Sequence, residues 1–302
     1  KGITKMTWRK FLFPCGFTVL FCIIVISCIE IVLRISGISY PLWTTLDSEL
    51  GWSFRPGLKG RFTREGAANV RINSTGFNAP EFDLSKPNDH LRIAIVGDSL
   101  VAAFQVEHEQ HFAEIAENKV RNCLPTKFRS VDILPFGVNG YNTIQKLYMT
   151  SKTVTAYKPD VIIMEMLIDT DLPENTNWRG GESAQPYATL VGDTIVIHDE
   201  DMKSAEFLAE KLVWDRKASI INNLHTLQLL IEAKIYLDVF INFVRTRFSN
   251  NNQSTGSPNS DASDDTPAKL DTAWSVMQSL LVRFKDMTEE AGARPMLMPL
   301  ST

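Results

Sequence analysis

The longest apolar run lies near the start of the chain. No charged residue occurs from Phe11 to Ile29, and four basic residues precede this run: Lys1, Lys5, Arg9 and Lys10. At about 1.5 Å per residue, a helix over 11–34 crosses a hydrocarbon core of about 30 Å. Because positive charge marks the cytoplasmic side, residues 1–10 are predicted to be a cytoplasmic flank and 11–34 a transmembrane anchor.

Two other interpretations fit the run less well. A cleaved signal peptide would have a shorter apolar region followed by small residues, whereas Glu30 to Arg34 follow here. A buried core helix is the less favoured alternative, because this run is apolar on every face. We therefore expect an uncleaved single-pass anchor with residues 35–302 as a periplasmic or extracellular domain.

Short apolar runs alternate with helical patterns through the rest of the chain. Strands are predicted at Arg92–Val96, Val131–Phe136, Val161–Leu167 and Arg294–Leu300, and helices at Glu107–Cys123, Tyr141–Tyr157 and Leu270–Ala291. Strands that alternate with helices at these intervals indicate a parallel sheet with crossover connections. The predicted fold class is therefore α/β, a three-layer parallel sheet of flavodoxin-like type preceded by one transmembrane helix.

The segments between these elements have patterns of their own. Residues 36–49 form a linker, Val70–Gly76 alternates as a strand beside the main sheet, and Asn177–Glu200 resembles an inserted hairpin. Asn223–Phe248 has a broad apolar face that can pack on the core, on the membrane surface or on a partner, and core packing is the default expectation. Residues 249–267 hold almost no apolar side chain and are predicted to be disordered.

Composition narrows the class of protein. The 302 residues are 44% hydrophobic and 22% charged, which is ordinary for a folded protein. A net charge of −4 argues against a general nucleic-acid binder. Of four cysteines, Cys15, Cys22 and Cys28 lie in the apolar run and only Cys123 lies outside it. This spacing offers neither a disulfide framework nor a zinc site, and we expect no metal and no cofactor.

Candidate chemistry stands at the end of the strand Arg92–Val96. Gly97, Asp98 and Ser99 follow this strand directly, at the edge where open α/β sheets bind ligands. A serine there can act as a nucleophile if a base accepts its proton and donors hold the oxyanion. The alternative is purely structural, since Asp98 or Ser99 can cap a following helix.

The surrounding segments resemble a known superfamily. Gly-Asp-Ser after a strand resembles the first block of the SGNH (GDSL-like) hydrolases, and Leu50–Gly57 and Val70–Phe82 resemble the lead-in of their membrane-anchored bacterial members. Phe136–Thr143 resembles the second block and Lys158–Asn175 the third. The resemblance implies an esterase or O-acyltransferase acting on acylated cell-surface glycans or similar esters.

The resemblance also implies roles for individual residues. Ser99 matches the nucleophile, whose own backbone N–H contributes to the oxyanion hole. Gly140 is the best match to the glycine that provides a second backbone N–H, and Gly137 is the less favoured choice. Gly97 and Asp98 match structural positions of the first block.

The third block departs from the family pattern. Similar members have Gly-Asn-Asp after the strand, and this chain has Asp169, Thr170 and Asp171. Thr170 thus stands at the position of the oxyanion asparagine, with a shorter reach, and Asp171 keeps a structural position. Losing one oxyanion donor costs ~10²–10³ in rate, and the charge of Asp169 opposes a nearby oxyanion.

The general base is not identified. The family takes it from a late Asp-x-x-His motif, and none of the histidines has an aspartate three residues before it; they are His90, His108, His111, His198 and His225. We expect His108 and His111 on the outer face of a helix. Either the protein continues beyond Thr302 and contains such a motif there, or the chain has kept the fold of the family and lost its catalytic activity.

Two hypotheses of different classes follow. The first is a membrane-anchored SGNH hydrolase-like protein that is weak or inactive with these residues alone. The second is a non-catalytic SGNH-like accessory or structural subunit of a membrane protein complex. In both hypotheses the protein associates with a membrane, and in neither does it bind nucleic acid.

Overall fold

The computed structural model describes residues 7–176, 178, 184–192, 194–249 and 266–300, with side chains from residue 16 to residue 247 and beyond 265 within those ranges. Residues 250–265 of the predicted disordered segment and residues 1–6 of the basic flank fall outside the described residues, whereas Ser249 ends one helix and Pro267 begins another. Backbone contacts divide the chain into two units, which are described separately: residues 1–42 with 218–253, and residues 43–217 with 254–302.

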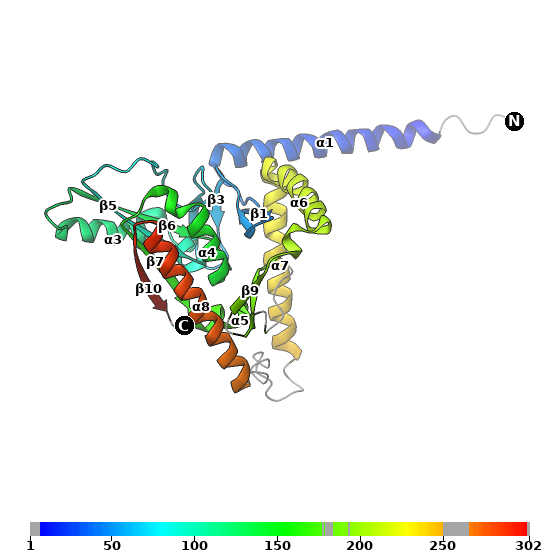
Figure 1. Ribbon diagram of the computed structural model, residues 1–302. Coiled ribbons are helices and arrows are strands. Elements are labelled where there is room, and N and C mark those ends of the chain that lie inside the picture. The colour runs from blue at the N-terminus through cyan, green and yellow to red at the C-terminus, as the bar shows by residue number, and fades with distance from the viewer. Residues whose placement is uncertain (1–6, 177, 179–183, 193, 250–265, 301–302) are drawn as a thin grey trace. The chain divides into compact units, whose positions relative to one another are not determined.

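The larger unit is built on a four-stranded parallel sheet, so the chain has a mixed α/β fold (Figure 1). Its strands run in the order β10-β7-β5-β6. They are β5 (His90–Gly97), β6 (Ser130–Gly137), β7 (Val161–Leu167) and β10 (Arg294–Leu300). All four strands were predicted from the sequence. β10 pairs only with β7 among the described strands, and an edge position tolerates its two prolines, which cannot donate to a ladder.

Helices pack on both faces of this sheet. Ala94 and Val96 of β5 belong to the main core with Ile144 of α4 (Thr143–Lys152). Ile95, which points the other way, packs with Ala113 of α3 (Phe112–Val120). This alternation along one buried strand is the period of two expected of a strand covered on both sides.

The remaining helices are assigned as follows. The α-helices of this unit are also α2 (Ser99–Ala102), α5 (Ile168–Asn175), α8 (Pro267–Glu290) and most of α6 (Ala205–Asn223), and the 3₁₀ turns are η1 (His108–Gln110), η2 (Arg121–Cys123), η3 (Val154–Tyr157) and η4 (Asp201–Lys203). α5 begins directly after β7. Pro173 lies inside this short helix, where its missing N–H leaves out one intrahelical hydrogen bond.

Three small antiparallel pairs surround the sheet. They are β1 (Thr44–Asp47) with β2 (Gly51–Phe54), β3 (Lys59–Phe62) with β4 (Ala68–Arg71), and β8 (Tyr187–Val191) with β9 (Thr194–His198). The last pair is the expected hairpin. The expectation that residues 36–49 are only a linker is wrong, since β1 lies there; a four-residue strand is too short to show an alternating pattern.

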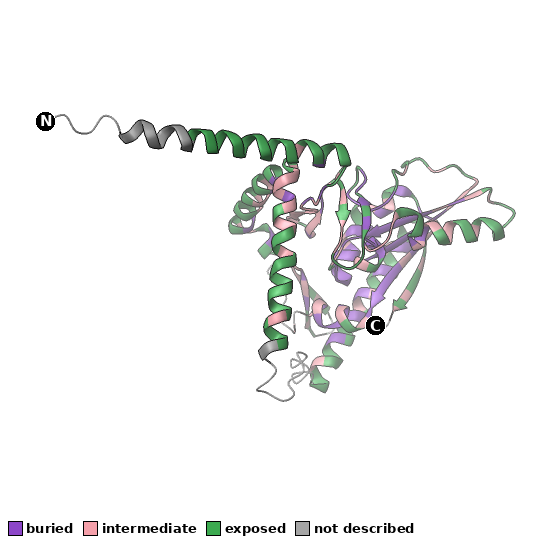
Figure 2. Cartoon of the chain, turned by 180° about the vertical axis from the view of Figure 1, so that it is seen from behind, coloured by how far each residue is buried: buried purple, intermediate pink, exposed green. Residues whose placement is uncertain are grey.

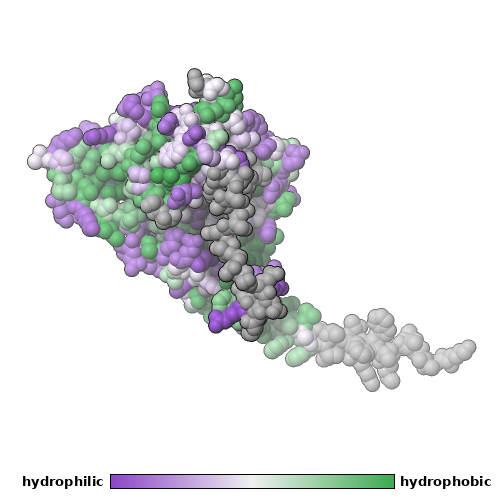
Figure 3. Space-filling model, turned by 90° about the horizontal axis from the view of Figure 1, so that it is seen from below, coloured by the Kyte–Doolittle hydropathy of each residue, from purple (hydrophilic) through white to green (hydrophobic). Residues whose placement is uncertain are grey.

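The smaller unit contains α1 (Thr7–Ser36), α7 (His225–Ser249) and the end of α6. Residues Gly16–Ser36 have a mean hydropathy of 2.7, and α1 is the one helix in the described ranges that is long and apolar enough to cross a membrane. In Figure 2 the residues of α1 that have a burial class are almost all coloured as exposed, and Figure 3 shows hydrophobic residues on the visible part of α1. The expected core packing of Asn223–Phe248 is wrong, because α7 exposes large apolar side chains such as Leu237 and Phe240.

Candidate functional site

Ser99 stands at the first position of α2, directly beyond the carboxyl end of β5. Asp98 is the N-cap of this helix, and its Oδ1 accepts from the backbone N–H of Leu100 at 2.8 Å. Capping is thus the role of Asp98. The half-buried Ser99 side chain has no hydrogen-bond partner within the described part of the chain, so its hydroxyl is free to meet a ligand.

The two glycines after β6 have different roles. Gly137 lies opposite Gly97 in the sheet, and a Cβ on Gly137 would lie 2.2 Å from the backbone nitrogen of Ala102 in α2. Gly137 therefore lets α2 approach the sheet. Gly140 is exposed and has a φ of +77°, which favours glycine. In the described residues the backbone N–H groups of Ser99 and Gly140 donate to no protein group, as an oxyanion hole requires.

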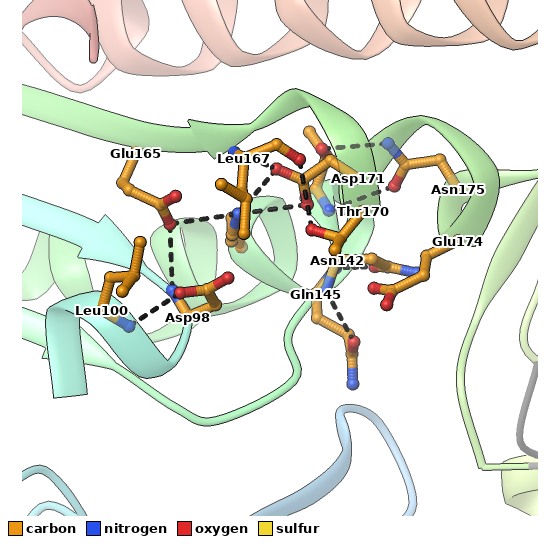
Figure 4. Close-up of polar contacts among 12 residues, drawn as sticks. Asp98, Leu100, Asn142, Gln145, Glu165, Leu167, Thr170, Asp171, Glu174 and Asn175 are labelled. Carbon is orange, nitrogen blue, oxygen red and sulfur yellow. Dashed lines mark hydrogen bonds and ion pairs between the residues drawn. The ribbon is translucent and has the colours of Figure 1, made fainter. Parts of the chain in front are cut away.

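Thr170 lies at the same edge of the sheet as Ser99. It is in the first turn of α5, which follows β7, and β7 pairs with β5. The Thr170 hydroxyl donates to the carbonyl oxygen of Leu167 at 3.2 Å (Figure 4). The hydroxyl is engaged in its own helix, and it would have to leave this carbonyl to donate to an oxyanion.

A buried cluster of charges lies beneath this edge and was not predicted. Lys146 of α4 places its Nζ 2.9 Å from Oδ2 of Asp171 and 3.3 Å from Oε2 of Glu165. The Lys146 and Glu165 side chains are fully buried and that of Asp171 is 2% exposed. A cationic group at this depth is stable only when paired, and here two carboxylates share it.

This cluster joins the strand ends that carry the site. Oε2 of Glu165 also accepts from the backbone N–H of Asp98 at 3.2 Å. Oδ2 of Asp171 accepts from the backbone N–H of Leu167 at 2.9 Å (Figure 4). Lys146 thus holds together the turn after β5, which presents Ser99, and the turn after β7. The one signal in the sequence was Glu165, the single charge inside an apolar strand.

Burial and charge oppose each other in this cluster. Burial raises the pKa of Asp171 to about 6, although Lys146 and the Leu167 N–H lower it. Burial likewise raises the pKa of Glu165 against the attraction of Lys146. For Lys146 burial lowers the pKa, but Asp171 and Glu165 outweigh it and the pKa is raised. The lysine therefore stays charged, and the proton that the cluster can gain or lose near neutral pH is on a carboxyl.

His111 is not on an outer surface, and that expectation is wrong. It is 2% exposed and caps α3, with Nδ1 accepting from the backbone N–H of Ala113 at 3.1 Å. Nε2 therefore carries the proton and donates to the carbonyl oxygen of Val101 at 3.2 Å. Burial lowers the pKa of His111 to about 4. With both ring nitrogens engaged, His111 has no lone pair with which to activate Ser99.

Among the described residues, no hydrogen bond joins the Ser99 hydroxyl to another histidine of this unit. His108 is exposed in η1, as expected. His90 is at the opposite end of β5, 3.5 Å from Asp132, and Nε2 of His198 is 2.9 Å from the hydroxyl of Thr189 in the hairpin. No group of three or more His, Cys, Asp and Glu side chains that could hold a metal ion occurs in the part of the chain that the structure describes.

Comparisons with known proteins give a likeness to solved structures alone. No protein-family model and no curated protein matches the chain. Among solved structures, the chain is similar to the crystal structure of AlinE4, an SGNH-hydrolase family esterase, at 24% identity and a TM-score of 0.24. The match covers 33% of this chain and spans about half, 48%, of that one. At this TM-score the likeness carries no argument about activity, which has to be argued from the site itself.

Proposed function

We propose that this chain is a membrane-anchored SGNH hydrolase-like protein of the esterase or O-acyltransferase type. α1 is its anchor, with the N-terminus in the cytoplasm, and the three-layer sheet domain lies outside. Ser99 receives the acyl group of an acylated cell-surface glycan or a similar ester. The backbone N–H groups of Ser99 and Gly140 hold the oxyanion.

The observation that carries this proposal is the free Ser99 hydroxyl. The Ser99 side chain is half-buried at the carboxyl edge of the sheet. Two backbone N–H groups on neighbouring strand exits, those of Ser99 and Gly140, donate to no group among the residues that the structure describes. A serine serving only as a cap would have its oxygen bound to the first turn, and here Asp98 has that role. A nucleophile and two donors at one edge suit acyl transfer.

Two features make the activity of these residues weak. The Thr170 hydroxyl is engaged with Leu167, so the third oxyanion donor is missing, at a cost of ~10²–10³ in rate. His111 is engaged at both ring nitrogens. Without a base the serine hydroxyl keeps its proton and attacks slowly.

The same two features favour a second candidate function. A non-catalytic accessory subunit of a membrane complex needs the fold and the anchor, but neither an oxyanion donor at Thr170 nor a base. In that case the Lys146 cluster serves only to hold the domain together.

Hydrolysis of a small activated ester by the protein in detergent tests the two candidates. For the enzyme, Ser99→Ala abolishes hydrolysis and labelling by a serine-directed phosphonate. Thr170→Asn raises the rate by about tenfold or more, since an amide donor is restored. Ser151→Ala is the matched control and changes nothing, because the exposed Ser151 hydroxyl donates to the Tyr148 carbonyl within α4. Equal rates for the protein, Ser99→Ala and Thr170→Asn would rule out the enzyme and favour the accessory subunit.

A further inference from the structure

One side of α7 is apolar and uncovered. Apolar residues spaced three and four apart form a row along one face of the helix, which we call the α7 stripe: Leu230, Ala233, Leu237, Phe240 and Val244. Leu230, Leu237 and Phe240 are 63%, 55% and 61% exposed. Asp238 and Asn242 lie away from the stripe, where Val239 is also exposed. An exposed apolar stripe of this length marks a surface that meets another apolar phase.

The start of α7 is fixed to α1. The Glu30 carboxylate of α1 accepts from the backbone N–H of His225 at 3.1 Å, and from the N–H and hydroxyl of Thr226 at 2.7 and 2.8 Å. Glu30 is also paired with Arg34 at 2.7 Å. A carboxylate from one helix thus caps the other, since the first N–H groups of a helix have no partner within it.

This attachment sets the level at which α7 begins. Glu30 and Arg34 are the first charges after the apolar run of α1, and charges of this kind lie where a spanning helix leaves the hydrocarbon core. Figure 1 shows α7 running across the direction of α1 within this unit. If α1 crosses the bilayer, α7 therefore runs along the outer surface of the bilayer. With 25 residues at ~1.5 Å each, it extends for about 38 Å.

We propose that α7 lies in the outer membrane–water interface, with the α7 stripe in the acyl chains beside α1. The inference rests on the proposed anchor. Lys234, Arg245 and Arg247 of α7 outnumber Glu232 and Asp238, and this excess of basic residues suits lipid phosphates. The alternative is that a second copy of the chain covers the stripe.

Spin labels on single cysteines measure the depth of each side of α7. The full chain, with its four native cysteines replaced by alanine, is reconstituted in phosphatidylethanolamine–phosphatidylglycerol vesicles. Labels are attached through Leu237→Cys and Phe240→Cys on the stripe. Asp238→Cys and Asn242→Cys are matched controls on the same turns. Ile24→Cys reports the depth of α1.

The expected result is a reversal of accessibility within one turn. Labels at 237 and 240 collide several-fold more often with dissolved oxygen than with a water-soluble nickel complex. Labels at 238 and 242 collide more often with the nickel complex. Aqueous labels at 237 and 240 with a deep label at 24 would overturn the inference and leave the anchor standing. An aqueous label at 24 would overturn both. Labels at 237 and 240 shielded from both reagents, with spin–spin broadening, would mean that a second copy covers the stripe.

Discussion

Replacing Lys146 by methionine is the sharpest perturbation of the candidate site. Methionine keeps much of the length and apolar stem of lysine and removes only the charge and its donors. The ammonium is fully buried between Glu165 and Asp171, so Lys146→Met leaves two carboxylates without their shared partner. Removing one member of a buried pair lowers the free energy of unfolding by about 3–5 kcal/mol, because the charges left behind have neither water nor a counterion.

The carboxylates themselves set how this loss varies with pH. Without Lys146, protonation is the remaining way to neutralise Glu165 and Asp171, whose pKa values burial already raises. The destabilisation is therefore largest near pH 7 and shrinks toward pH 5. The variant with Lys146→Met, Glu165→Gln and Asp171→Asn recovers most of the stability, since neutral amides in place of the acids remove the unpaired charge.

Chemical denaturation in detergent, followed by near-ultraviolet circular dichroism, measures these free energies. Lys152→Met is the matched control, because Lys152 is on the same helix and its side chain is 40% exposed, and it changes the free energy of unfolding by less than about 1 kcal/mol. A loss below about 1 kcal/mol for Lys146→Met at pH 7 would refute the reasoning. A triple variant as unstable as Lys146→Met alone would also refute it, since the cost would then not come from unpaired charge.

Two further predictions concern the same sheet edge. The pKa of Asp171 is raised to about 6 in the folded protein from 3.8, so the folded state binds more protons between these values and this group's contribution to stability falls as pH rises from about 4 to about 6. Asp171→Asn removes that fall, on the order of 2–3 kcal/mol, and denaturation of both proteins at pH 4 and pH 6.5 checks it; an unchanged pH slope would contradict the assignment. Gly137→Ala lowers stability by about 3 kcal/mol, because its Cβ meets the Ala102 backbone, whereas Gly140→Ala costs only about 1–2 kcal/mol of left-handed strain. Equal melting temperatures for these two variants would disprove the different roles of the glycines.

Much of the fold follows from local patterns in the sequence. The strands at 92–96, 131–136, 161–167 and 294–300 were predicted because buried parallel strands are continuous apolar runs, and their order of alternation with helices implied a parallel sheet. The apolar length of α1 was equally evident. The small strands β1 to β3 were missed, because a strand of four residues is stabilised by its partner and not by its own pattern.

The sequence by itself determined which residues end up at the sheet edge, since carboxyl ends of parallel strands meet there. Ser99, Gly140 and Thr170 each follow such a strand. Only the tertiary structure decided what their atoms do. Hydrogen bonds between residues far apart in the chain have no local signature, so the partners of Lys146, separated from it by 19 and 25 positions, could not be predicted. His111 is buried and α7 is exposed for the same reason, because burial depends on which elements pack together, and the pattern of one helix does not specify its neighbour.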